Sequence, residues 1–333
     1  MYWFRVQRKA LYSSRSKDRW HLTTPGSPVT AALTGFQQTY DRRTTVERNH
    51  ASTTNAAMSM PSNTQAELVI FRKTNVHRGR HISVTPENST NKHLAYGRII
   101  LDATVPSASF ANDGRETGLI VLSGEAEVQV GAESSALGRF DSIYIPRDSV
   151  VEVKTSTTTD IAEFSADVAS RSPVQVVRYA DICKDPTQVF TAGSGTAACR
   201  HLHMCLANNI QAGRLVVGFT WSEPGHWTSW PPHEHARLLE EMYVYFDMPA
   251  PAFGIQLVYN NTEYPEMLTV VREGDAVLMP GGYHPNVSVP GHRICFLWAM
   301  AAHRELEDRR FGVVNVQPGF DQSGSGLEAG RNR

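Results

Sequence analysis

Short runs of alternating apolar and polar residues, separated by Gly, Pro, Asn and Asp, cover the chain from about residue 61 to residue 317. A period of two is typical of antiparallel β-strands, and the separating residues predict turns. The predicted strands are Gly118–Val130, Ser142–Val153, Leu215–Thr220, Met242–Phe246, Gly254–Tyr259, Ala276–Met279 and Ile294–Met300. Many short strands at near-even spacing favour a sandwich or barrel, so we expect an all-β fold.

An internal repeat divides this β-rich part into two copies. The run RFDSIYIP (Arg139–Pro146) parallels EGDAVLMP (Glu273–Pro280), and in each an aspartate lies five residues before the proline. Repetition of this kind predicts two copies of one structural unit. Nine residues after its aspartate the second copy has His284, whereas the first copy has Val150. We therefore expect the first barrel to be structural and the second to carry the chemistry.

The length of 333 residues agrees with two domains. We assign residues 61–170 to a degenerate N-terminal barrel and residues 171–317 to a metal-binding C-terminal barrel. Residues 1–60 are rich in Ser, Thr and Arg without sustained periodicity, so we expect a disordered or transit-like extension. Residues 318–333 are expected to be a flexible tail.

Composition and charge narrow the class of protein. Apolar residues make up 41% and charged residues 20%, as in soluble globular proteins, and no apolar run approaches the ~20 residues of a membrane span. The formal charge of −1 combines a basic segment 1–60 with an acidic remainder, which is unfavourable for nucleic acid. Four cysteines without a CxxC spacing predict reduced thiols. We expect a cytoplasmic protein, or a mitochondrial one if residues 1–60 are a transit peptide, with neither membrane nor nucleic-acid partners.

The candidate chemistry lies in the second copy. His233 and His235 form a His-x-His pair, whose side chains point the same way on an extended strand. Glu240 and Glu241 follow them, and His284 comes after the strand that ends at Pro280. Each feature alone has an ordinary structural explanation. In this order, together with the Gly-Asp…Pro-Gly-Gly run, they form the two-part pattern of cupin barrels, which hold a divalent metal with three imidazoles and one carboxylate.

Several segments resemble the 5-deoxy-glucuronate isomerase family of inositol catabolism and its relative, the 5-keto-4-deoxyuronate isomerase of pectin breakdown. The segments are Trp227–His235, Leu239–Tyr243, Phe253–Tyr259, Gly282–Pro285 and Leu297–Arg304. The resemblance implies two tandem cupin barrels and one bound divalent ion, zinc or else manganese or iron. It further implies aldose–ketose isomerisation of a deoxy-uronic acid, with 5-deoxy-D-glucuronate and 5-dehydro-2-deoxy-D-gluconate as the pair, by a protein that forms homo-oligomers.

Either neighbouring glutamate could complete the metal site. The general cupin spacing selects Glu240, whereas the resemblance selects Glu241. Because alternate strand residues face opposite sides, choosing Glu241 lines the cavity with Tyr243 and Tyr245, which suit a polar sugar acid. We therefore expect His233, His235, Glu241 and His284 to be the metal ligands.

The remaining candidates follow from the chemistry. Proton transfer between two carbons needs an acid–base group, for which we expect Glu240 and Tyr283. An anionic substrate needs cations, which Arg200, Arg237 and Arg304 could supply. Further expected cavity residues are Tyr243, Tyr245, Gln256 and Tyr259. A cupin oxygenase with the same ligands and a non-catalytic sugar-binding cupin are the alternatives.

Overall fold

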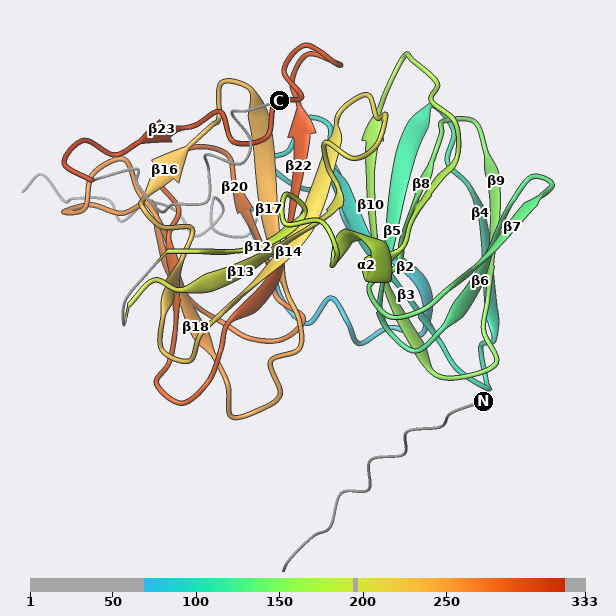
Figure 1. Cartoon of the computed structure of the whole chain (residues 1–333), viewed down its shortest axis with the longest axis horizontal. Coiled ribbons are helices and arrows are strands. Elements are labelled where there is room, and N and C mark those ends of the chain that lie inside the picture. The colour runs from blue at the N-terminus through green and yellow to red at the C-terminus, as the bar shows by residue number, and fades with distance from the viewer. Residues whose placement is uncertain (1–68, 194–196, 321–333) are drawn as a thin grey trace, which may run out of the picture. The chain divides into compact units, whose positions relative to one another are not determined.

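The computed structural model describes residues 69–193 and 197–320, which are mainly β-strands (Figure 1). Within these residues the one helix is the single turn α2 (Tyr179–Ile182), and no helix has the length and hydropathy needed to cross a bilayer. The predicted all-β fold class is confirmed. The extension expected at residues 1–60 and most of the expected tail lie outside the described residues.

The first half forms two antiparallel sheets. The six-stranded sheet consists, in spatial order, of β11 (Gln175–Val177), β8 (Ser142–Ile145), β5 (Arg115–Ser123), β10 (Thr159–Asp167), β3 (Ala95–Leu101) and β2 (Gly79–Val84). The four-stranded sheet consists of β4 (Ser107–Ala111), β9 (Val150–Lys154), β6 (Ala126–Val130) and β7 (Glu133–Leu137). Apolar side chains of both sheets, such as Leu119 and Val128, form one buried cluster. The interior of this half is therefore a packed apolar core.

The second half repeats this arrangement. Its seven-stranded sheet consists of β1 (Ile70–Phe71), β20 (Ala276–Met279), β17 (Leu239–Tyr245), β22 (Cys295–Ala302), β14 (Leu215–Ser222), β13 (Arg200–Leu206) and β12 (Val189–Ala192). Its four-stranded sheet consists of β15 (Trp227–Thr228), β21 (Asn286–Ser288), β18 (Gly254–Val258) and β19 (Met267–Val271), and a separate pair joins β16 (His233–Glu234) to β23 (Asn315–Val316).

The predicted strands lie close to observed ones, with two differences. The run Gly118–Val130 divides into β5 and β6, because Gly124 adopts a positive φ of 75° in the turn between them. The run Ser142–Val153 likewise divides into β8 and β9. In both cases the sequence pattern predicted one long strand where a tight turn separates two apolar strands.

The two halves exchange their first strands. β1 precedes the first half in sequence but pairs with β20 of the second, whereas β11 precedes the second half but pairs with β8 of the first. The repeated aspartates hold these strands: Asp275 accepts a hydrogen bond from Arg72 at 2.6 Å, and Asp141 accepts one from Arg178 at 2.9 Å. Strand pairing thus crosses the proposed domain boundaries of residues 61–170 and 171–317.

The large sheets are buried on both faces, which explains their nearly continuous apolar sequences. All seven residues of β17 and all eight of β22 are buried. One apolar cluster contains Tyr96 and Phe164 of the first half together with Met242 and Val244 of the second. One face of β17 therefore packs toward the other half, and the opposite face lines the second barrel.

Two buried glutamates fasten this junction in the same way. Glu116, the second residue of β5, accepts hydrogen bonds from the amides of residues 213–215 at 2.6–2.7 Å. Glu240, the second residue of β17, accepts them from the amides of residues 92–94 at 2.6–2.8 Å. Glu116 of the first barrel thus binds three amides where β14 of the second barrel begins. Glu240 of the second barrel binds three amides just before β3 of the first.

Candidate metal centre

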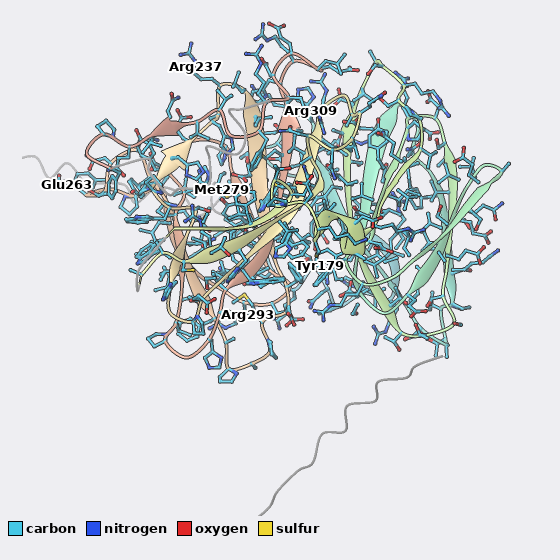
Figure 2. All side chains as sticks on the ribbon, viewed as in Figure 1. Tyr179, Arg237, Glu263, Met279, Arg293 and Arg309 are labelled. Carbon is cyan, nitrogen blue, oxygen red and sulfur yellow. The ribbon has the colours of Figure 1, made fainter. Side chains whose placement is uncertain are left out.

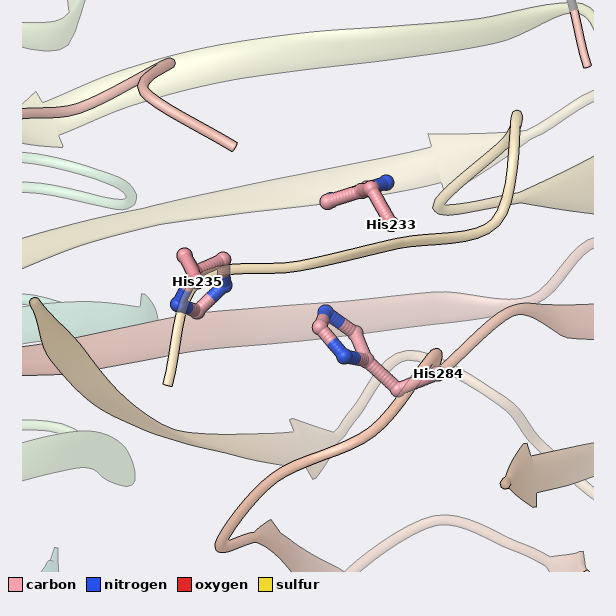
Figure 3. A group of neighbouring side chains, drawn as sticks. All are labelled: His233, His235 and His284. Atoms are coloured by element: carbon pink, nitrogen blue, oxygen red, sulfur yellow. The ribbon is translucent and has the colours of Figure 1, made fainter. Parts of the chain in front are cut away.

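Three histidines meet inside the second barrel. His233 begins β16 and His235 follows it, while His284 lies in the connection between β20 and β21 (Figure 3). One ring nitrogen from each lies within 4.8 Å of the others, and the three side chains are 9%, 7% and 2% exposed. The structure therefore brings together the three histidines that the sequence singled out.

Backbone carbonyls orient all three rings. The Nδ1 atoms of His233, His235 and His284 lie 2.8, 3.3 and 2.9 Å from the carbonyl oxygens of Pro231, Leu239 and Gly282. A carbonyl only accepts, so each Nδ1 carries a hydrogen, and Nε2 is the ring atom that each histidine can offer to a metal ion. Fixing one ring nitrogen in this way is how proteins orient metal-binding histidines.

Glu241 completes the cluster from β17. Its Oε2 lies 3.0 Å from Nε2 of His235 and 3.1 Å from Nε2 of His284, and its side chain is 2% exposed. Burial alone would raise the pKa of Glu241, but the neighbouring imidazoles of His235 and His284 outweigh it and lower the pKa to about 2. The carboxylate is therefore ionised at neutral pH.

The cluster fits a divalent cation. Burial, with smaller effects of His284 and His235, lowers the pKa of His233 to about 3, so this imidazole is neutral at physiological pH. Nε2 of His284 is buried, and apart from the close approach of Oε2 of Glu241 at 3.1 Å it has no hydrogen-bond partner among the described residues. A cation bound by the Nε2 atoms and Glu241 would satisfy that orphaned nitrogen and the buried negative charge together.

Glu240 does not join the histidines. Its carboxylate is 5% exposed and binds the amides of residues 92–94, on the face of β17 opposite to Glu241. Adjacent strand residues point to opposite faces, so only one of the two glutamates can reach the cavity. The role of Glu240 as a catalytic proton shuttle stays a prediction, and its contacts in the structure are those of a residue that joins the barrels.

A model of the KduI/IolB family matches residues 69–313, well over half of the chain. The chain belongs to the KduI/IolB family. The 5-deoxy-glucuronate isomerase of Geobacillus kaustophilus is 26% identical over 253 residues, covering 71% of this chain and 89% of that protein. The 4-deoxy-L-threo-5-hexosulose-uronate ketol-isomerase of Opitutus terrae is 30% identical over 206 residues, covering 59% and 70%. The prediction of an isomerase related to these families is thereby confirmed.

Solved structures share the fold of this KduI/IolB family member. An IolB-like protein from Salmonella typhimurium LT2 superposes with a TM-score of 0.63 at 22% identity, covering 78% of this chain and 99% of that one. Oxalate decarboxylase of Bacillus subtilis superposes with a TM-score of 0.52 at 11% identity, covering 69% and 76%. Together with the strand topology, these neighbours confirm the predicted cupin fold.

A pocket next to the cluster contains two of the expected substrate residues. Arg200 and Tyr243 line it together with His233 and Glu241. The sequence did not single out the remaining lining residues, which are Leu202, Thr220, Ser229, Phe296, Trp298, Met300 and Phe311. The strands β14 and β22 are buried on both faces, so hydrophobic alternation could not tell which of their residues face the pocket.

Three expected cavity residues, Tyr245, Gln256 and Tyr259, make hydrogen bonds away from the pocket wall. The hydroxyl of Tyr245 donates to Oε1 of Gln256 at 2.6 Å, and Asn286 donates to the same oxygen at 3.2 Å. Tyr259 donates to Gln317 at 2.7 Å, and its backbone pairs with Tyr283. The residues that line the pocket do not include Tyr245, Gln256, Tyr259 or Tyr283.

Two expected arginines lie at the surface. Arg237 is exposed and projects outward (Figure 2). Arg304 is 62% exposed at its side chain and pairs with Glu307 at 2.6 Å and Asp308 at 2.7 Å. Neither is among the residues that line the pocket, and their role in binding the substrate stays a prediction. Of the three arginines, Arg200 alone lines it.

Proposed function

We propose that this protein is a metal-dependent aldose–ketose isomerase that converts 5-deoxy-D-glucuronate to 5-dehydro-2-deoxy-D-gluconate. The observation that carries the proposal is the convergence of three oriented imidazoles and one ionised carboxylate beside a pocket lined by Arg200. The named activities of its relatives support the class of substrate. Zinc suits the donor set, with manganese or iron as alternatives.

His233, His235, Glu241 and His284 would hold the ion. When bound, a divalent ion supplies a Lewis acid for the substrate's carbonyl and adjacent hydroxyl oxygens. Residues of the pocket wall would bind the rest of the substrate. The guanidinium of Arg200, 4% exposed, would pair with the uronate carboxylate, which is anionic throughout the reaction.

Tyr243 is well placed to hold a proton in the pocket. Burial, and next the negative charge of Glu241, raise the pKa of Tyr243 well above its usual value, so the phenol stays protonated. Its hydroxyl lies 2.6 Å from Oγ of Ser229. We propose that Tyr243 donates a hydrogen bond to the oxygen that becomes negative as the enediolate forms. Tyr283, half-buried beside His284, stays our candidate for proton transfer.

The decisive experiment combines metal analysis with NMR of the purified protein and 5-deoxy-D-glucuronate. We expect one tightly bound divalent ion at this site, and loss of the aldehyde signal with equal gain of a ketone signal. Oxygen consumption is expected to be zero, which separates an isomerase from an oxygenase. A fully metal-loaded protein that leaves both 5-deoxy-D-glucuronate and 4-deoxy-L-threo-5-hexosulose uronate unchanged would contradict the proposal.

A matched pair of histidine variants tests the site itself. His284→Ala removes a buried ring at the centre of the cluster and should abolish metal binding at this cluster, and turnover, while the β-core stays folded. His292→Ala, in the turn before β22, should change neither. Full metal occupancy in the His284→Ala protein would show that the site lies elsewhere.

A further inference from the structure

A second group of metal-binding side chains lies on the other face of the sheet that carries Arg200. One ligand atom from each of Cys199, His201 and Glu223 lies within 4.8 Å of the other two. Cys199 and His201 flank Arg200, and alternation along β13 places them on the face opposite to the pocket. The group is therefore separate from the three-histidine cluster.

The backbone brings these three residues together. His201 pairs with Trp221 across β13 and β14, and the amide of Glu223 donates to the carbonyl of Cys199 at 3.0 Å. Directly opposed residues in antiparallel strands have side chains on one face. Glu223 therefore faces Cys199, and the His201 ring lies on the same face two residues further along the strand.

Polar neighbours orient the ligands. Nε2 of His201 lies 2.8 Å from Oε1 of Glu223, while its Nδ1 lies 3.0 Å from the hydroxyl of Thr191 on β12. Nδ1 of His226 accepts a hydrogen bond from the amide of Cys199 at 3.0 Å, which ties that residue to the turn after Glu223. Hydrogen bonds to the far nitrogen of an imidazole and to the ligand backbone are typical supports of metal sites.

We propose that Cys199, His201 and Glu223 form a second site for a divalent zinc ion, with water as the fourth ligand. A thiolate, an imidazole and a carboxylate together match the ligand preferences of zinc. Tetrahedral zinc needs its ligand atoms about 3.4–3.8 Å apart, which side-chain rotation can achieve from the observed spacing. The side chains of His201 and Glu223 are 30% and 47% exposed, so an ion can enter from solvent.

Cobalt(II) provides a signal specific to this site, because a thiolate bound to cobalt gives a charge-transfer absorption and the three-histidine cluster contains no sulfur. Metal-stripped full-length protein titrated with cobalt chloride should develop this band until one thiolate-bound cobalt ion is present per chain, while the three-histidine cluster takes up cobalt without contributing to it. Cys199→Ser and His201→Ala should abolish it, and Glu223→Gln should weaken binding at least about tenfold. A wild-type protein without the band would overturn the proposal.

Two matched variants make the assignment specific. All four cysteines are free thiols, as predicted, and Cys183 is exposed, so Cys183→Ser should keep the band. His233→Ala should also keep it, whether or not the proposed isomerase is correct, because that histidine belongs to the other cluster. In wild-type protein, zinc should slow alkylation of Cys199 at least tenfold and leave Cys183 unaffected. Persistence of the band in the Cys199→Ser variant, or equal alkylation of both thiols, would refute the site.

Discussion

The neighbours Glu240 and Glu241 have the same side chain and opposite surroundings. Glu240 is surrounded by backbone amides of the other barrel, whereas Glu241 faces two imidazoles. Both are buried, so composition and burial alone do not distinguish them. The difference follows from the alternation of β17, which directs one side chain to the junction and the next to the cavity.

This difference predicts opposite effects of two identical substitutions. Glu241→Gln should lower metal affinity at least about a hundredfold and abolish turnover, because a neutral amide replaces a charged ligand. Glu240→Gln should bind the same number of metal ions per chain as the wild-type protein when both are measured at low temperature. Metal content after dialysis, measured for both proteins, checks the prediction. Loss of metal only from the Glu240→Gln protein would reverse the assignment.

His203 on β13 makes stability depend on pH. It is 3% exposed, stacks on Phe219 at 4.3 Å between ring centroids and lies 3.2 Å from the hydroxyl of Tyr179. Burial, with a smaller effect of the neighbouring His201, lowers the pKa of His203 to about 4 from 6.5. The unfolded chain therefore binds more protons between these values, so stability falls as the pH falls from about 6.5 to about 4.

Replacing this histidine should remove its part of the acid sensitivity. Between pH 6.5 and 5.5 the His203 contribution to the free energy of unfolding should fall by about 1 kcal/mol. The His203→Phe protein keeps an aromatic ring against Phe219 and should lose correspondingly less stability over this range. Urea unfolding of both proteins at the two pH values measures the difference. Equal losses would show that His203 does not titrate in this way.

At the scale of elements, corresponding strands of the two barrels make corresponding contacts. Glu116 on β5 and Glu240 on β17 each receive three amide hydrogen bonds from the other barrel, and Asp141 and Asp275 each hold an arginine that follows an exchanged strand. Thr117 in the first barrel stands where Glu241 stands in the second. The repeat has thus kept its junction contacts and differs at the position of Glu241.

Because both glutamates are buried hydrogen-bond acceptors, each should matter for stability. Glu116→Gln, which lies outside the barrel that contains the three histidines, should lower the free energy of unfolding by about 2–4 kcal/mol, since the amide cannot accept all of the bonds the carboxylate accepts. Metal affinity should stay within about threefold of wild type. Thermal unfolding with metal analysis tests this, with exposed Glu133→Gln as the control. An unchanged melting temperature would contradict the role of Glu116.

At the scale of the whole molecule, the exchanged strands make the two barrels one structural unit. The described residues, 69–193 and 197–320, belong to one compact unit. β1 completes the sheet that carries Glu241, although some 170 residues separate the two in the chain. A separately expressed segment 171–317 would lack that strand. Homo-oligomerisation stays a prediction.

Two truncations test how far the chain can be shortened. A protein that begins at Met58 retains β1 and should keep wild-type turnover and melting temperature, since the family match begins at residue 69. One that begins at Asn75 loses β1 and Arg72, which binds Asp275. Its melting temperature should fall by roughly 5–10 °C, or about 3 kcal/mol. Calorimetry and kinetic assays compare them. A large loss of activity in the Met58 protein would show that the preceding residues contribute.

The sequence alone determined the β-rich pattern, the repeat and the three histidines, because strand alternation and His-x-His spacing are local properties. The exchange of β1 and β11 was missed, although a local signal existed: Ile-Phe-Arg before the first barrel resembles Val-Val-Arg before the second. Which strand pairs with which follows from tertiary packing, both for β1 and β20 and for β11 and β8, and leaves no trace in periodicity.

The tertiary structure decided which face of each buried strand meets the cavity. β17 and β22 are buried on both sides, so the pattern of their apolar residues does not indicate which residues face the cavity and which face the other barrel. Only packing against the other barrel assigns Glu240 to the junction, Glu241 to the histidines and Arg200 to the pocket wall. Arg237 and Arg304 have the positive charge expected of a residue that binds an anionic substrate, but both lie at the surface away from the pocket. The sequence gives the charge of a side chain, whereas its position depends on the fold.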